Sequence, residues 1–349
     1  MSRTNKTLAV KYRPQIFDDV VEQDSIKIIL QQQLESDEVK NVYLFCGGAG
    51  TGKTTCARIF ANEINKGKGN PIEIDAASNS GVDNVREIGQ QAQTKSLSSE
   101  YKVFIIDECH SLSDKGWQAF LKLIEEPPAK TVFIFCTTDP QKIPKTILSR
   151  VQRYDFNRIS QKGICRRLEL IYHSEVVERN LPVNTNYKDG MEYIAKIADG
   201  GMRDAISLME KCLAYNADLT VENIIAALGT VDYETMVELT EQIMNGDTHE
   251  VMETIENVYA SGKDIKQFVK LYTHFLLDVT KYFVGCDWKY LQIPKTKVYK
   301  KALKNLEESA ENCFGLLDAV VKLNSQIKWS KSAKYDVECA IMLFMEVQP

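Results

Sequence analysis

An eight-residue segment, Gly47-Gly-Ala-Gly-Thr-Gly-Lys-Thr54, separates a short apolar run from an amphipathic one. It fits the pattern G-x-x-x-x-G-K-[ST], in which glycines let successive backbone N–H groups point at phosphate oxygens. The apolar run 42–46 predicts a strand before the segment, and residues 53–64 predict a helix after it. A glycine-rich turn that arose by chance would rarely have both a strand before it and a helix after it. The segment therefore predicts a phosphate-binding loop in an α/β domain.

Apolar and amphipathic segments alternate along roughly the first 157 residues. Strands are expected at 42–46, 72–74, 103–106 and 132–136, because these runs are apolar nearly throughout, as in parallel strands covered on both faces. Helices are expected at 26–34, 53–64, 82–93 and 117–124, the last stopped by Pro127 and Pro128. This alternation predicts a doubly wound parallel sheet.

The strand signal stops after about Arg158. Helical periodicity continues to the end of the chain, as in the face formed by Met236, Leu239 and Ile243. We expect three domains: an α/β core at 1–157, a small helical lid at 158–219 and an all-α domain at 220–349.

The composition is that of a soluble globular protein, with 44% hydrophobic residues, 26% charged residues and a net charge of -5. Any DNA contact must therefore come from a local basic surface. No segment approaches the roughly 20 apolar residues that span a bilayer, and a signal peptide is not evident. We expect a cytoplasmic protein that makes no membrane contact. The nine scattered cysteines lack C-x-x-C spacing and predict buried thiols, without disulfides or zinc.

Two carboxylates, Asp107 and Glu108, directly follow the apolar run 103–106. This places them at the edge of a parallel sheet where ligands bind. Asp107 can hold magnesium together with the Thr54 hydroxyl, and Glu108 can polarise an attacking water. An acidic strand end is also common on solvated surfaces. Its combination with the phosphate-binding loop favours hydrolysis of a nucleoside triphosphate.

Three further residues have side chains suited to the same chemistry. Thr138 ends an apolar strand and can orient water beside Glu108, whereas Arg150 and Arg203 carry guanidinium groups that bind phosphate bidentately. A lone arginine is more often solvated or salt-bridged, so these two assignments need additional support.

The order of the motifs provides that support, because it resembles the bacterial DNA polymerase III gamma/tau family of clamp-loader ATPases, which are members of the AAA+ class. The resemblance begins at Lys11-Tyr-Arg-Pro14 and covers about two-thirds of the chain. It continues through the loop that ends at Thr54 and through Asp107-Glu-Cys-His110. Further along the chain it includes residues 121–128, residues 137–150 and the segment Gly201-Met-Arg-Asp-Ala205. The fold implied is an AAA+ core, a helical lid and an all-α collar.

The resemblance implies specific roles for the residues at these positions. Lys53, Asp107, Glu108, Thr138, Arg150 and Arg203 would be catalytic: Thr138 as the first sensor, Arg203 as the second sensor, and Arg150 as an arginine finger inserted into a neighbouring subunit's site. Thr54 and Asp107 would bind Mg²⁺. The ATP-binding residues would be Tyr12, Val20, Val21, Gly47, Gly48, Ala49, Gly50, Thr51, Gly52, Lys53, Thr54, Thr55 and Arg203.

The same resemblance implies partners. The chain would assemble with other clamp-loader subunits, as a pentamer joined by the collar, and load a sliding clamp onto primer-template DNA during replication by the polymerase holoenzyme. The helix at 113–124 would touch the clamp, and Lys122 and Lys142 would contact the DNA backbone. A solvated helix face explains those two lysines equally well.

The chain also departs from the family pattern. Cellular members carry a four-cysteine zinc module where residues 62–70 are rich in glycine and lysine and contain no cysteine, so zinc is not expected. Glu22 stands where glycine is usual, and no long tail follows Pro349, which leaves the long isoform's polymerase and helicase contacts unsupported. A compact, zinc-free chain points to a phage-encoded or divergent bacterial member.

Two other functions fit some of these features. A different AAA+ machine, such as a branch-migration helicase, would normally end in a winged-helix module with strands, whereas the last 130 or so residues have helical periodicity only. A scaffold that binds nucleotide without hydrolysing it would not need Glu108.

Overall fold

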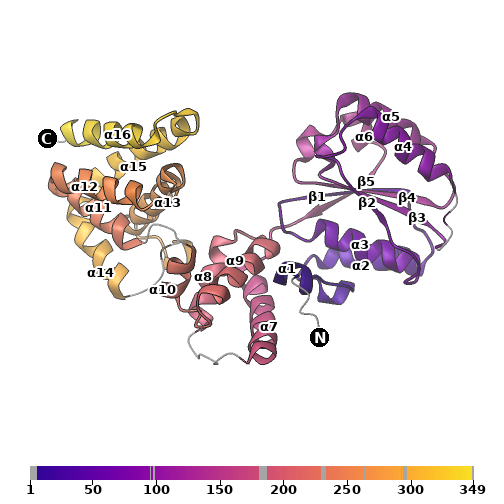
Figure 1. Cartoon of the computed structure of the whole chain (residues 1–349), viewed down its shortest axis with the longest axis horizontal. Coiled ribbons are helices and arrows are strands. Elements are labelled where there is room, and N and C mark those ends of the chain that lie inside the picture. The colour runs from indigo at the N-terminus through magenta and orange to yellow at the C-terminus, as the bar shows by residue number, and fades with distance from the viewer. Residues whose placement is uncertain are drawn as a thin grey trace. The chain divides into compact units, whose positions relative to one another are not determined.

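The computed structural model describes residues 6–94, 96, 99–180, 187–228, 233–262, 264–291, 293 and 297–347. A five-stranded sheet lies at the centre of the N-terminal part (Figure 1). Its strands are β1 (Val42–Gly47), β2 (Ile72–Asp75), β3 (Lys102–Asp107), β4 (Thr131–Thr137) and β5 (Gln152–Phe156). The strands predicted at 42–46, 72–74, 103–106 and 132–136 correspond to β1, β2, β3 and β4. β1 and β2 are each one residue longer at the carboxyl end, and β3 and β4 are each one residue longer at both ends.

The strand order is β2-β3-β4-β1-β5, and all neighbouring strands are parallel. Parallel neighbours require crossover connections, so helices cover both faces of the sheet. Consequently every residue of β4 and all but the last of β1 are buried, which explains their continuous apolar sequences. The carboxyl ends of β1, β3 and β4 therefore lie at one edge of the sheet.

Helices pack on the two faces of this sheet (Figure 1). One face is covered by α2 (Asp24–Glu35) and α3 (Lys53–Ile64), and the other by α4 (Val82–Gln93), α5 (Asp114–Glu125) and α6 (Lys145–Leu148). Phe60 of α3 packs edge-on against Tyr43 of β1, with ring centroids 5.0 Å apart. On the opposite face Phe120 of α5 meets Phe135 of β4 at 5.2 Å. Burial of these aromatic rings fixes the helices against the sheet.

Short elements flank the sheet, and three helices follow it in the region predicted to be a lid; they are called the lid helices below. The short elements are α1 (Leu8–Lys11), η1 (Phe17–Asp19), η2 (Cys109–Ser111) and η3 (Pro140–Lys142). The lid helices are α7 (Gln161–Arg179), α8 (Tyr187–Ile197) and α9 (Met202–Tyr215). Helix α7 begins at a conventional N-cap, because the Ser160 hydroxyl accepts a hydrogen bond from the amide of Gly163.

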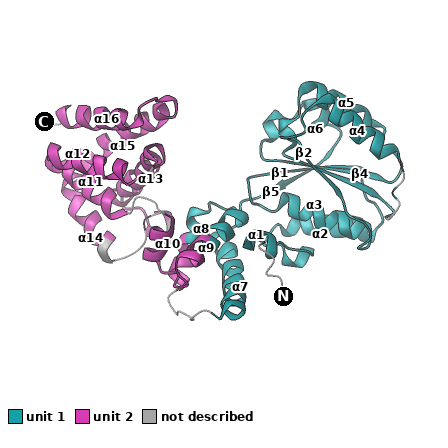
Figure 2. Ribbon diagram, in the orientation of Figure 1, with its two compact units in different colours: residues 1–181, 194–210 teal, residues 182–193, 211–349 magenta. Residues whose placement is uncertain are grey.

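The chain forms two compact units, coloured separately in Figure 2. The first comprises Met1–Leu181 and Ile194–Glu210, and the second comprises Pro182–Tyr193 and Lys211–Pro349. The region expected to be a separate lid at 158–219 therefore contributes to both units. The three-domain division with boundaries at 157 and 219 stays a prediction.

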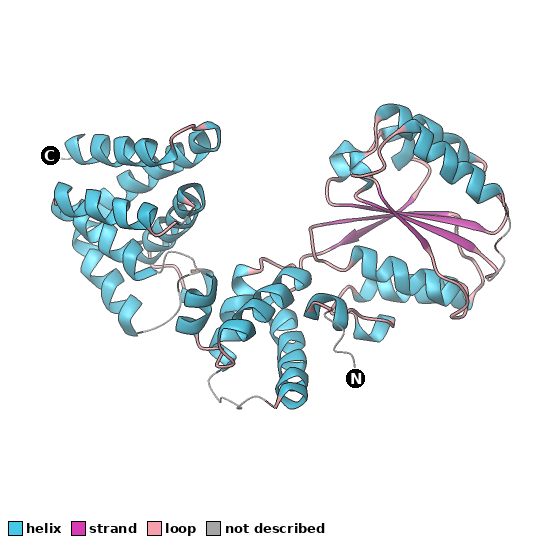
Figure 3. Ribbon diagram, in the orientation of Figure 1, coloured by secondary structure: helices cyan, strands magenta, loops and turns pink. Residues whose placement is uncertain are grey.

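Among the described residues of the second unit, helices joined by loops and turns are the only regular secondary structure (Figure 3). It contains α10 (Val221–Leu228), α11 (Tyr233–Asn245), α12 (Thr248–Ala260), α13 (Ile265–Phe283), η4 (Trp288–Tyr290), α14 (Lys297–Asn305), η5 (Leu306–Ser309), α15 (Ala310–Gln326), η6 (Ile327–Trp329) and α16 (Ala333–Val347). Its core includes Met236, Leu239 and Ile243, the face predicted from their spacing. Among the described residues, no helix has both the length and the apolar character needed to cross a bilayer.

Candidate nucleotide-binding and hydrolysis site

A cavity of about 270 Å³ opens beside the loop between β1 and α3, within the first unit. Residues from the N-terminal segment, the loop, the end of β3 and the lid line it. The predicted site residues among them are Tyr12, Val20, Val21, Ala49, Gly50, Thr51, Gly52, Lys53, Thr54, Thr55, Asp107, Glu108 and Arg203. Gly47, Gly48, Thr138 and Arg150 are not in the lining.

The loop adopts the left-handed backbone that its glycines permit. Gly50 has φ +69° and Gly52 has φ +102°, values that residues with a Cβ rarely adopt. The Lys53 side chain folds back over the loop, and its Nζ donates hydrogen bonds of 2.8 Å to the carbonyl oxygens of Gly47 and Gly48. Lys53 is only 5% exposed, and burial lowers the pKa of its ammonium group. The loop and Lys53 thus form a cationic cradle at the cavity.

The first turn of α3 contacts the end of β3. Thr54 Oγ1 donates a hydrogen bond of 2.9 Å to Asp107 Oδ2, and Asp107 Oδ1 accepts the backbone amide of Glu108 at 3.0 Å. A hydroxyl and a carboxylate therefore meet at the cavity wall. Hard oxygen donors of this kind suit Mg²⁺.

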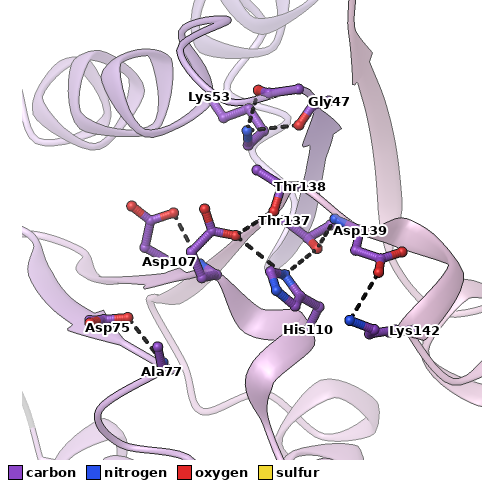
Figure 4. Close-up of polar contacts among 12 residues, drawn as sticks. Gly47, Lys53, Asp75, Ala77, Asp107, His110, Thr137, Thr138, Asp139 and Lys142 are labelled. Atoms are coloured by element: carbon purple, nitrogen blue, oxygen red, sulfur yellow. Dashed lines mark hydrogen bonds and ion pairs between the residues drawn. The ribbon is translucent and has the colours of Figure 1, made fainter. Parts of the chain in front are cut away.

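Glu108 leaves the strand with a left-handed backbone, at φ 47° and ψ 42°. Its Oε2 accepts a hydrogen bond of 2.8 Å from Thr138 Oγ1 and lies 3.2 Å from His110 Nδ1. Thr138 and His110, both labelled in Figure 4, lie in the segments that follow β4 and β3. Thr138, which was predicted to orient a water beside Glu108, therefore contacts the Glu108 carboxylate directly.

The start of α9 lies against the phosphate-binding loop. The amide of Met202 donates a hydrogen bond of 3.0 Å to the carbonyl oxygen of Gly50, and a Cβ added to Gly50 would lie 3.0 Å from the Cα of Gly201. This close approach brings Arg203 into the cavity lining.

Tyr12 reaches the cavity but is held by the lid helix α7. Its hydroxyl donates a hydrogen bond of 2.8 Å to Glu175 Oε1, and its carbonyl oxygen accepts one of 2.9 Å from Arg167. Glu175 is 1% exposed and also pairs with Lys11 at 2.6 Å and Arg179 at 2.5 Å. The N-terminal wall of the cavity is therefore anchored to the lid by a buried carboxylate.

Arg150 lies outside the cavity lining, after the short helix α6. Its Nε pairs with Glu125 Oε1 at 2.8 Å, and one terminal nitrogen donates to the carbonyl oxygen of Thr146 at 2.8 Å. The side chain is 41% exposed. Arg150 is thus fixed at the surface and does not line the cavity of its own chain.

Both candidate DNA-contact lysines are exposed. Lys122 is on α5, and Lys142 pairs with Asp139 at 3.1 Å with 63% of its side chain accessible. Neither lines the cavity.

Residues with no role assigned from the sequence also shape the site. Arg13 and Arg167 line the cavity. Burial is the largest cause that lowers the pKa of Arg13, and the nearby charges of Arg58 and Arg203 lower it further. The motif Lys11-Tyr-Arg-Pro14 contained a signal for Arg13, whereas the positions of Arg167 and His110 depend on long-range packing.

Gln23, another residue without an assigned role, joins three segments around the cavity. Its Nε2 donates to the carbonyl oxygen of Asn157 at 2.7 Å and to that of Thr51 at 3.4 Å. Its Oε1 accepts the Asn157 amide at 3.1 Å. The amide of Gln23 therefore holds the phosphate-binding loop beside the segment that follows β5.

Solved structures with a similar fold include the RuvB Holliday junction branch migration motor of Thermotoga maritima. This likeness covers 83% of the chain and 97% of that protein, with a TM-score of 0.52 and 18% identity. A single-residue variant of the same protein gives equivalent values. At this identity the likeness shows the fold alone, and it agrees with the predicted α/β core.

Two family models match the sequence: "DNA polymerase III, delta subunit" over residues 70–160, and "DNA polymerase III subunits gamma and tau domain III" over residues 219–312. The chain is 34% identical to DNA polymerase III subunit tau of Bacillus subtilis, over 95% of the chain and 62% of the relative. The subunit tau of Escherichia coli is 32% identical over 74% and 42%, and the subunit gamma of Buchnera aphidicola is 28% identical over 96% and 97%. The chain thus spans less than two-thirds of both tau subunits. Together these matches show that the chain belongs to the DNA polymerase III gamma/tau family.

Proposed function

We propose that this chain is an ATP-hydrolysing subunit of a sliding-clamp loader. One observation carries the proposal: the pairs Thr54–Asp107 and Thr138–Glu108 lie beside a phosphate-binding loop whose cavity also receives Arg203. Simple nucleotide binding would need the loop alone, whereas transfer of a phosphoryl group to water also needs a carboxylate near the γ-phosphate.

Binding follows from the groups in the cavity lining. The loop amides and Lys53 would bind the phosphates, and Arg203 from α9 would contact the γ-phosphate. Tyr12, Val20 and Val21 would pack around the adenine. Because Arg203 belongs to the lid, the γ-phosphate would draw the lid and the loop together.

Thr54 and Asp107 would hold Mg²⁺, since their hydroxyl and carboxylate are hard oxygen donors at the cavity wall. When bound, this ion neutralises charge on the phosphate oxygens. Glu108 would polarise the attacking water. The water oxygen bonds to the γ-phosphorus as the bond to ADP breaks, and the proton of the water passes to the Glu108 carboxylate.

Arg150 would complete the site of a neighbouring subunit. Its exposed guanidinium and its absence from the cavity lining of its own chain support a role in trans. The isolated chain should therefore hydrolyse ATP slowly. The helical region from 220 onward would form the collar of the oligomer, for which we propose five subunits.

Clamp and DNA contacts follow from exposed residues of the first unit. Helix α5 would touch the clamp, and Lys122 and Lys142 would bind phosphates of primer-template DNA. A branch-migration role is less well supported, because the described residues after 220 form helices and include no strand of a winged-helix module.

The test is the ATPase rate of the full chain, assembled with its companion subunits, with and without primed DNA and a candidate clamp. Stimulation by both supports clamp loading, and stimulation by junction DNA without any effect of a clamp supports branch migration. Glu108→Gln should bind ATP normally and lose at least about 100-fold in rate. An unchanged rate in Glu108→Gln would identify a nucleotide-binding scaffold.

A further inference from the structure

His110 lies behind the hydrolytic carboxylate and has no assigned role. It comes from η2, directly after β3, and its side chain is 19% exposed. Its Nδ1 lies 3.2 Å from Glu108 Oε2 and 3.2 Å from Thr137 Oγ1 (Figure 4). The imidazole thus bridges the ends of two adjacent strands, β3 and β4.

These neighbours determine where the imidazole carries its proton. An ionised carboxylate can only accept hydrogen bonds, so Nδ1 must carry a hydrogen to make a favourable contact with Glu108. The Thr137 hydroxyl oxygen already accepts the amide of Asp139 at 3.0 Å and has a second lone pair for Nδ1–H. In the Nδ1–H form of His110, both neighbours can therefore act as acceptors of this N–H.

The two donors to Glu108 converge on the same atom. Thr138 Oγ1 donates to Oε2 at 2.8 Å, and His110 Nδ1 approaches that oxygen at 3.2 Å. For Oε1, no hydrogen bond is found within the described part of the chain. Glu108 itself lines the cavity, so fixing Oε2 on the protein side leaves Oε1 as the oxygen available to a water.

We propose that His110 is a positioning residue for ATP hydrolysis. Its Nδ1–H, acting with Thr138, fixes Glu108 Oε2 so that Oε1 is aimed at the attacking water. His110 takes no part in proton transfer: the proton of the water passes to Glu108, and the broken bond leaves its electrons on ADP. The inference rests on the proposed function, in which Glu108 activates that water.

Three substitutions separate a positioning role from a structural one. His110→Ala removes the donor, and we expect kcat to fall about tenfold with an unchanged Kd for ATP, as for loss of one hydrogen bond to a charged group. His110→Asn places an amide nitrogen two bonds from Cβ, as Nδ1 is, and should restore kcat to within about threefold. His110→Gln places its amide nitrogen one bond further out and should stay low.

The measurements are kcat, KM and ATP affinity of the full chain, with thermal unfolding of each variant. His249→Ala, on the exposed side of α12 in the second unit, is the matched control and should equal wild type. If His110→Ala keeps the wild-type kcat while Glu108→Gln is inactive, the inference fails and the proposed function stands. Equal losses in the Asn and Gln variants, or a loss of ATP affinity in His110→Ala, also overturn it. If Glu108→Gln hydrolyses ATP at the wild-type rate, the proposed function is itself refuted.

Discussion

The amide of Met202 donates a 3.0 Å hydrogen bond to the carbonyl oxygen of Gly50, which joins the lid helix α9 to the phosphate-binding loop. A Cβ on Gly50 would lie 3.0 Å from Gly201 Cα, and a Cβ on Gly201 would lie 3.2 Å from the carbonyl oxygen of Ala49, so a side chain at either position would crowd the other segment. The loop is therefore in direct backbone contact with the helix that carries Arg203. This contact gives the loop a physical connection to the lid.

Gly50→Ala should weaken ATP binding at least tenfold. Its φ of +69° costs a residue with a Cβ about 1 kcal/mol, and the new methyl would meet Gly201 Cα at 3.0 Å. Isothermal titration with a non-hydrolysable ATP analogue measures the effect. Gly246→Ala is the matched control, because Gly246 has φ +78° with nothing within 4 Å of the added Cβ. Unchanged affinity in Gly50→Ala would contradict the proposed contact of loop and lid.

Arg13→Ala should raise the Kd for ATP about tenfold. The guanidinium lines the cavity near the positive charges of Arg58 and Arg203, an arrangement that an anion would stabilise. Arg86→Ala removes an exposed arginine of α4 and should leave Kd unchanged. The two proteins are compared by titration at two salt concentrations. If Arg13→Ala and Arg86→Ala bind ATP with equal affinity, Arg13 does not contact the nucleotide and serves only to stabilise the N-terminal segment.

Arg150→Ala should bind ATP as wild type does and lose about 1,000-fold in kcat in the assembled complex, as expected for an arginine finger. In the isolated chain the slow basal rate should not change. Arg153→Ala is the control, because Arg153 is 43% exposed and paired with Asp155 much as Arg150 is paired with Glu125. A wild-type rate for assembled Arg150→Ala would refute the role in trans.

Glu175→Gln should lower the free energy of unfolding at neutral pH by about 2 kcal/mol, because it weakens charge-assisted hydrogen bonds to a buried group. Burial alone would raise the pKa of Glu175, but hydrogen bonds from Lys11 and Tyr12 and the charge of Arg179 lower it below its ordinary value. A lowered folded pKa stabilises the fold above the unfolded value of about 4.3 and loses that contribution as pH falls through the folded pKa.

Urea unfolding between about pH 3 and 7 tests this linkage. The wild-type protein should lose more stability than Glu175→Gln as the medium is acidified below about pH 4.3. Glu178→Gln alters a carboxylate that also pairs with Lys11 but is 61% exposed, and it should cost less than about 1 kcal/mol. Parallel pH profiles for wild type and Glu175→Gln would show that the carboxylate contributes nothing through its ionisation.

Local sequence determined most of the secondary structure of the core. Helices α3 and α4 begin and end at the predicted residues, because their boundaries follow loop motifs and apolar periodicity. Helix α5 begins three residues before the predicted 117, since the Ser113 hydroxyl accepts the amide of Gly116 and caps an earlier turn. The phosphate-binding loop and the Asp107–Glu108 pair were likewise evident from residue types and spacing alone.

Tertiary structure alone decided which distant groups meet. The contacts Gly50–Gly201, Lys11–Glu175 and His110–Thr137 join residues far apart in sequence, and no local pattern specifies such pairs. They arise because β4 lies between β3 and β1, which brings two strand ends together, and because α7 and α9 pack beside the N-terminal segment and the loop. The sequence determines which chemical groups the chain carries at each residue. The distances between those groups in the site depend on long-range packing of the whole unit.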